Sequence, residues 1–179
     1  MVVIIVPIYW KEHGPSNFLW LSDIALLSMV PALWLENKLI PSMMAIGVVP
    51  LELLWNVDFI SGGNLLELAK YMFDPEMPLY LRGLSLFHVP LPFVILYAVF
   101  KLGYDKRALL YQFALILILI PISYWISPVK ENINWVFGFG EDPQTRLPPL
   151  LYLLLLMLGM CLLLIPMHFL MKRLFTKKI

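Results

Sequence analysis

Side chains suited to acid–base or nucleophilic chemistry gather at one end of the apolar segments of this chain. They are Asn17, Ser22 and Asp23 in the first segment, Glu52 and Asn56 in the second, Arg82, Ser85 and His88 in the third, and Asn134 in a later loop. Ionisable groups inside a bilayer are costly, so they usually pair with one another around a site or a water-filled cavity. We therefore expect these residues to form one functional site.

The histidine is the natural candidate for a general base, because a neutral imidazole takes up a proton near neutral pH. Ser85 precedes His88 by about one helical turn and shares its face, although a serine in a helix often bonds its own backbone instead. Ser22 stands beside a carboxylate. An arrangement of Ser22, His88 and either Asp23 or Glu52 would activate the serine as a nucleophile.

Structural roles explain the same residues. Arg82 is expected to pair with Glu52, Asp58 or Asp23. In the catalytic interpretation, either Arg82 or Asn134 holds an oxyanion or a lipid headgroup. Asn56 follows Glu52 by four residues, so the two point to one side of a helix. Polar contacts of this kind fasten membrane helices together at roughly 0.6 kcal/mol each.

No metal or cofactor is expected. His13 and His88 lack the paired spacing of a zinc site. Gly138 and Gly140 flank an aromatic residue in a turn, but the lysine and the following helix of a phosphate loop are missing.

Composition places the chain in a membrane. It is 61% hydrophobic and 14% charged, against about 45–50% and about 25% in soluble domains. Its net charge of +1 leaves no basic face for nucleic acid. Cys161 is the single cysteine, so no internal disulfide forms.

We expect one all-α membrane domain over residues 1–179, a bundle of five transmembrane helices near the roughly 20-residue spanning length. The predicted spans are 16–36, 40–60, 79–102, 107–126 and 149–170. The apolar start, MVVIIVPIYW, is too short to span and lacks the features of a secretory signal. It is expected to be an interfacial or re-entrant segment, with Tyr9 and Trp10 at headgroup level.

Basic residues set the orientation. One side carries most of them: Lys38, Lys101, Lys106, Arg107, Lys172, Arg173, Lys177 and Lys178. Because basic loops stay in the cytoplasm, we expect a cell-membrane protein with its N-terminus outside, its C-terminus inside and the polar site in the outer half of the membrane.

Loops and prolines are expected to shape that site. Residues 65–73, in the first long outer loop, are predicted to form an amphipathic surface helix that covers it. A proline removes the hydrogen bond to the carbonyl four residues back, so Pro92 frees the carbonyl of His88 and Pro90 that of Leu86. Prolines are common in membrane helices, so the kink either only shapes the bundle or opens a pocket at His88.

Three features resemble the androgen-induced family of multi-pass membrane proteins: MPLYLRGLSLFHVPLPFVILY, then NINWVFGF, then a long apolar helix. The resemblance implies an essential histidine at His88, followed by a Leu-Pro-Phe stretch (Leu91, Pro92, Phe93). It also implies an intramembrane threonine hydrolase of lipid esters, or an acyltransferase as in a related branch. The family's threonine falls on Trp20, with Ser22 just after. The chain also looks like a group of bacterial multi-pass proteins.

The sequence thus favours a lipid-active intramembrane hydrolase or acyltransferase, with membrane lipids as partners. His88 is the base, Ser22 the nucleophile, and Asp23 or Glu52 orients the histidine. The alternative is a non-catalytic lipid-binding or scaffold subunit of a membrane complex. For either function, the partners expected besides lipids are further copies of the chain in a homo-oligomer or another protein of a membrane complex. A transporter is disfavoured, because the ALILILI stretch offers no polar path.

Overall fold

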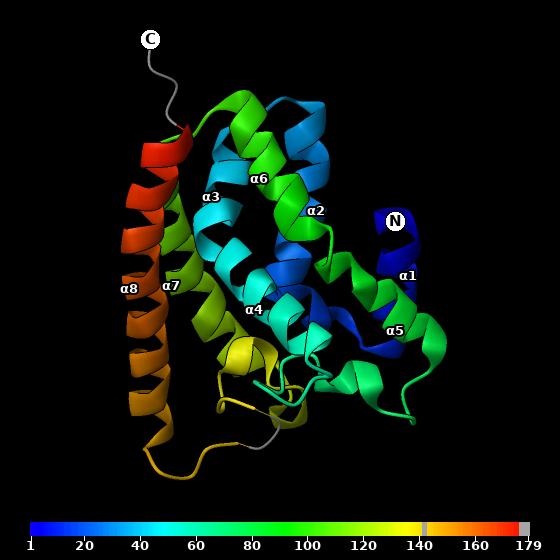
Figure 1. The fold of residues 1–179 in the computed structure, drawn as a ribbon. Coiled ribbons are helices and arrows are strands. Elements are labelled where there is room, and N and C mark those ends of the chain that lie inside the picture. The colour runs from blue at the N-terminus through cyan, green and yellow to red at the C-terminus, as the bar shows by residue number, and fades with distance from the viewer. Residues whose placement is uncertain (141–142, 176–179) are drawn as a thin grey trace.

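The computed structural model describes residues 1–140 and 143–175, and within these ranges it contains helices and loops but no strand (Figure 1). The α-helices are α1 (Val2–Glu12), α2 (Leu21–Trp34), α3 (Leu39–Gly47), α4 (Val49–Ile60), α5 (Leu79–Ser85), α6 (Leu91–Leu102), α7 (Ala108–Ile126) and α8 (Pro149–Phe175). The short 3-10 helices are η1 (Pro15–Leu19), η2 (Lys70–Phe73), η3 (Leu86–His88), η4 (Val129–Glu131) and η5 (Ile133–Trp135). The all-α prediction is confirmed.

Three helical stretches in the described part are long and apolar enough to cross a membrane: α5 to α6 (Leu79–Leu102), α7 and α8. A fourth forms if α3 and α4, which meet at a 50° bend, act as one broken span. The five predicted spans are therefore not all confirmed. The first, 16–36, is interrupted, because residues 15–19 wind into η1 and Trp20 adopts an extended backbone, which leaves only 14 residues in α2.

The apolar core lies around α3, which packs against α6, α7 and α8. Fully buried isoleucines from these elements fill it, among them Ile46, Ile95, Ile116 and Ile120. Helices α7 and α8 run side by side along one flank, while α1 and α5 stand on the opposite flank (Figure 1). This asymmetry separates an apolar scaffold from a more polar side.

The N-terminal segment is a helix that packs on the bundle. Tyr9 is buried and its hydroxyl is 3.0 Å from Oγ of Ser85 in α5. Trp10 is 60% exposed. The expected headgroup position therefore suits Trp10, while Tyr9 points into the protein, where its hydroxyl finds a partner.

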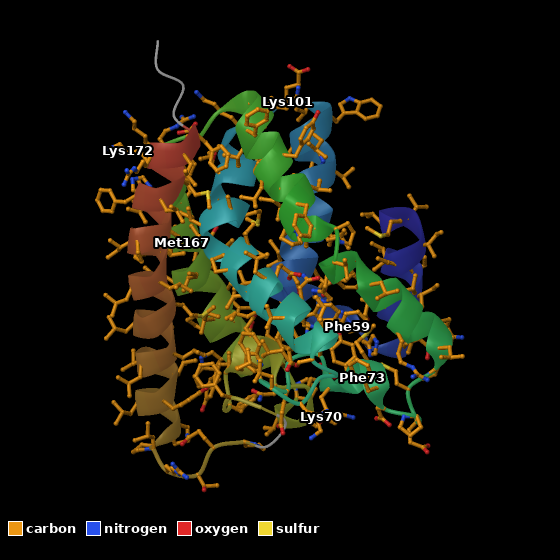
Figure 2. All side chains as sticks on the ribbon, in the orientation of Figure 1. Phe59, Lys70, Phe73, Lys101, Met167 and Lys172 are labelled. Carbon is orange, nitrogen blue, oxygen red and sulfur yellow. The ribbon has the colours of Figure 1, made fainter. Side chains whose placement is uncertain are left out.

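The ends of the molecule differ in charge. Lys101 and Lys172 lie at the end where α6 finishes and α8 ends, and Lys70 lies at the opposite end (Figure 2). Between α6 and α7, Arg107 binds the carboxylate of Asp105 at 2.9 Å and holds the pKa of that buried carboxyl below its usual range. Lys101 and Lys172, two members of the basic set predicted for the cytoplasmic side, thus lie at one end of the molecule, away from Lys70.

The bend between α3 and α4 has an unusual neighbour. Gln112 of α7 is fully buried, neither its amide nitrogen nor its oxygen has a hydrogen-bond partner, and it packs against Gly47 at the end of α3. A Cβ added to Gly47 would overlap the Gln112 amide. A residue larger than glycine at this position would therefore force the Gln112 side chain to move.

Gly47→Ala should lower the free energy of unfolding by about 1–3 kcal/mol, since overpacking a tight core forces neighbours to move. Adding Gln112→Ala should recover part of that loss, with a coupling energy on the order of 1 kcal/mol. Unfolding in detergent, followed by helical circular dichroism, measures both.

Gly159→Ala is the matched control. No atom lies within 4 Å of a Cβ at this position in α8, so the substitution should not destabilise. Equal losses at positions 47 and 159, or strict additivity with Gln112→Ala, would contradict the packing explanation.

Candidate functional site

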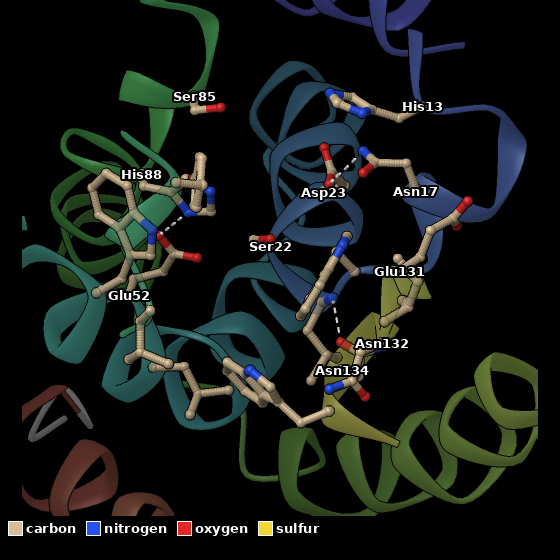
Figure 3. Close-up of a pocket in the computed structure, with 18 of the residues that line it drawn as sticks. His13, Asn17, Ser22, Asp23, Glu52, Ser85, His88, Glu131, Asn132 and Asn134 are labelled. Atoms are coloured by element: carbon tan, nitrogen blue, oxygen red, sulfur yellow. Dashed lines mark hydrogen bonds and ion pairs between the residues drawn. The ribbon is translucent and has the colours of Figure 1, made fainter. Parts of the chain in front are cut away.

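A cavity of about 500 Å³ lies between α1 and α5 on one side and α2, α4 and the loop after α7 on the other (Figure 3). Seven of the nine predicted site residues line it: Asn17, Ser22, Asp23, Glu52, Ser85, His88 and Asn134. Arg82 and Asn56 lie outside the lining. The clustering inferred from the sequence is therefore a real proximity in space, and the volume suits a small ligand or a lipid headgroup.

The central feature is a histidine–carboxylate pair. Nδ1 of His88 lies 2.8 Å from Oε2 of Glu52, and both side chains are largely buried. An ionised carboxylate only accepts hydrogen bonds, so Nδ1 carries the hydrogen and Nε2 of a neutral ring is the basic nitrogen. Among the described residues no partner contacts Nε2, so it is available to a ligand in the cavity.

The imidazole is held by packing as well as by Glu52. Its ring stacks between Trp55, at 4.6 Å, and Phe87, at 4.1 Å between centroids. Nδ2 of Asn56 donates to the His88 carbonyl at 2.9 Å and to the Glu52 carbonyl at 2.7 Å. The first of these is the carbonyl that Pro92 was predicted to free. Asn56 thus positions His88 through its backbone.

The two serines differ. Oγ of Ser85 shares a hydrogen bond with the Tyr9 hydroxyl. Ser22 lines the cavity at the start of α2 and is partly exposed. Within the described residues, neither hydroxyl is hydrogen-bonded to His88, so the predicted serine–histidine contact is not formed in this structure.

Asp23 is the second buried acid of the lining. It is 4% exposed; Oδ2 accepts a long bond, 3.4 Å, from Asn17, and Oδ1 has no partner. His13 lies beside this pair (Figure 3), and burial lowers the pKa of its imidazole. Within the described residues, no lysine or arginine forms an ion pair with Asp23.

The expected ion pair of Arg82 is absent from the described part of the chain. Its guanidinium makes one long bond, 3.5 Å, to the Met72 carbonyl, and Nε is buried without a partner. Asp58, one of the predicted partners, instead accepts backbone N–H bonds from Leu65, Leu66 and Ala69 at 2.7–3.0 Å. Its negative charge is satisfied by the loop, which leaves no need for arginine.

That loop differs from its prediction. Residues 65–69 form turns wound around the Asp58 carboxylate, and only η2 is helical, so the amphipathic helix predicted over 65–73 is wrong. The segment still covers the site, because Leu68 and Tyr71 line the cavity. The physical reason is local: three backbone N–H groups bind one carboxylate and cannot also make helical bonds.

The side chain of Asn134 makes three structural hydrogen bonds that its position in the sequence did not predict. Its amide donates to the Leu19 carbonyl at 2.7 Å and to Oγ of Ser123 at 3.1 Å. Its oxygen accepts from the Leu21 amide at 3.0 Å. Both amide hydrogens are used, so this side chain joins the loop to α2 and α7 and has no donor left for a substrate.

Sequence reasoning missed the aromatic wall of the cavity, which includes Trp20, Trp55, Tyr71 and Trp135. Trp135 stands in the aromatic NINWVFGFG stretch, so its type could have indicated an aromatic wall. The backbone conformation that turns it toward the cavity could not be inferred from the residue types. Asn132, Asn134 and Trp135 all have positive φ angles, between 43° and 57°, a conformation that single asparagines tolerate and bulky residues rarely adopt.

Among residues 1–140 and 143–175, no group of three histidine, cysteine or acidic side chains is arranged to hold a metal ion. Comparisons with protein-family models, with characterised proteins and with solved structures find no match to this chain. The resemblance to the androgen-induced family therefore stays a prediction, and function has to be argued from the site itself.

Asn134→Ala should lower the free energy of unfolding by roughly 2–4 kcal/mol, because it leaves several buried backbone and hydroxyl groups without partners. Asn64→Ala is the control, since that exposed side chain bonds only the nearby Gly62 carbonyl. Thermal unfolding of the two variants in the same detergent measures the difference. Equal melting temperatures would show that the bonds of Asn134 contribute no net stability.

Proposed function

We propose that the protein is a lipid-active membrane enzyme that hydrolyses an ester or transfers its acyl group. The observation that supports this most directly is the 2.8 Å contact between His88 and Glu52 beside a cavity, with Nε2 left free. A positioned base whose second nitrogen is oriented by a carboxylate is the core of many acyl-transfer sites.

In this reaction Nε2 of His88 takes the proton of an attacking hydroxyl as its oxygen bonds to the ester carbonyl carbon. The bond from that carbon to the alkoxy oxygen then breaks, and the imidazolium returns the proton to the departing alkoxide. Glu52 keeps the ring in the required tautomer and stabilises its positive charge, without itself becoming protonated.

Two oxygens are candidates for the attack. A water molecule held by Nε2 would give the free acid and the alcohol in one displacement. Ser22 would instead form an acyl-serine that water or a second alcohol then cleaves, and that route requires Ser22 to approach His88 when substrate binds. Catalytic hydrogen bonds are often long or absent before the substrate is bound, so Ser22 remains a candidate nucleophile in the proposal.

The surroundings suit an amphiphilic substrate. Apolar side chains such as Val48, Leu51 and Met77 line the cavity beside its polar groups. In the described part of the chain, the side-chain amide of Asn17 donates only to Asp23, so its second hydrogen can bind a carbonyl oxygen or a headgroup. As part of the proposal, the site faces the outer leaflet, since Lys101 and Lys172 lie at the other end of the molecule (Figure 2).

A non-catalytic lipid-binding protein is the second candidate. It is favoured by one observation, that neither Ser22 nor Ser85 is hydrogen-bonded to His88 among the described residues. In that case Glu52 and His88 hold α4 and η3 together, and the cavity binds a lipid without changing it.

The deciding experiment measures hydrolysis of short-chain esters and diacyl lipids in micelles, together with fluorophosphonate labelling of serine. His88→Asn should lower kcat/KM by about 10²- to 10⁴-fold, the usual contribution of a general base. Ser22→Ala should abolish labelling and turnover if the serine attacks, or leave turnover intact if water attacks.

His168→Asn is the matched control. This second buried histidine bonds the Tyr104 hydroxyl at 2.7 Å, far from the cavity lining, so the substitution should leave turnover unchanged. If the wild-type protein retains lipid through purification but cleaves no ester, the enzyme proposal fails and the lipid-binding function takes its place.

A further inference from the structure

Two tryptophans form a corner of the cavity wall. The rings of Trp20 and Trp135 are 5.7 Å apart and nearly perpendicular, at 76°. Trp20 immediately precedes α2, whose first turn carries Asp23 three residues further on. Trp135 reaches this position only with a positive φ of 57°, which is a strained conformation for a bulky residue. The two tryptophans and Asp23 line the same cavity.

The charge of the lining is negative. Asp23, Glu52, Glu67 and Glu131 contribute four carboxylates, against Lys130 as the one lysine or arginine of the lining. Glu52 is paired with His88, and Glu67 is 3.8 Å from Lys70 outside the lining. Counting only the other two acids, the cavity still carries more negative than positive charge.

Within the described residues, Asp23 lacks a partner for one of its carboxylate oxygens, and a bound ligand could supply that partner. Asp23 is 4% exposed and lines the cavity, and in the described part of the chain its Oδ1 has no hydrogen-bond donor. A buried carboxylate without a partner is costly. A cation that enters the cavity would remove that cost.

We infer that the cavity binds a cationic ammonium group, as in a choline or ethanolamine headgroup, between Asp23 and the Trp20–Trp135 corner. Aromatic faces attract quaternary ammonium ions through the ring quadrupole, and tryptophan does so most strongly. The carboxylate supplies the counter-charge. This inference builds on the proposed function by naming the class of substrate, but the binding step can be tested without any turnover.

The test is titration of the purified wild-type protein with choline, followed by tryptophan fluorescence and calorimetry. The matched ligand is 3,3-dimethylbutan-1-ol, which has the shape of choline without the charge. Choline should bind at least 10-fold more tightly than the neutral alcohol. Asp23→Asn and Trp20→Leu should each weaken choline binding about 10-fold or more, while Glu76→Gln, an equal charge change on the exposed surface, should not.

A short-chain diether phosphocholine lipid, which has no ester to cleave, distinguishes the source of the ammonium group. Tighter binding of this lipid than of choline identifies a lipid headgroup, and equal binding identifies a free amine. Equal affinities for choline and the neutral alcohol would overturn the inference, as would unchanged choline binding in both Asp23→Asn and Trp20→Leu. Ester hydrolysis with no choline binding would overturn this inference and leave the proposed enzymatic function standing. Choline binding with no hydrolysis would overturn the proposed enzymatic function and leave this inference standing.

Discussion

Pro92 has no amide hydrogen, so the carbonyl of His88 cannot be satisfied by its own helix. Inside a membrane no water is available to donate a hydrogen bond to this carbonyl, and leaving it unpaired would cost several kcal/mol. The side-chain amide of Asn56, in α4, donates a hydrogen bond to the His88 carbonyl. The same amide nitrogen also donates to the backbone carbonyl of Glu52. One side chain therefore fixes the two backbone positions from which the imidazole and the carboxylate meet. The site exists because a break in one helix is repaired from another.

Three buried acids, Asp23, Glu52 and Asp58, have three different environments. Asp58 is surrounded by backbone N–H groups and shapes the loop that covers the cavity. Glu52 is bound to His88. Asp23 has only one long bond. Burial is costly for all three negative charges, so the three carboxylates differ in the hydrogen-bond partners that offset this cost. Asp23, the acid with the poorest partner, lines the same cavity as Trp20 and Trp135.

The sequence predicted the helical class, the gathering of polar residues and the consequence of Pro92, because each follows from composition or from spacing along one helix. It did not predict which polar groups pair. Arg82 and Asp58 looked complementary, yet Asp58 takes its partners from its own following loop. The break before Trp20 and the positive φ angles at Asn132, Asn134 and Trp135 also escaped notice, since neither leaves a trace in apolar periodicity. Contacts between segments and backbone handedness are decided by tertiary packing.

The proposed reaction explains only some of the polar residues at the polar end of this bundle. Asn56, Asp58, Asn132 and Asn134 all bond backbone groups that no helix satisfies, because the cavity is built from helix ends, 3-10 turns and loops. Irregular backbone at membrane depth survives only where it lines a cavity and is satisfied by protein or water. The lining also contains His88, Glu52, Asp23 and Ser22, and no side-chain hydrogen bond from these four to a backbone group is formed in the described part of the chain. They are a base, the acid that orients it, a second acid and a hydroxyl, which is the set that the proposed chemistry on a bound lipid would need.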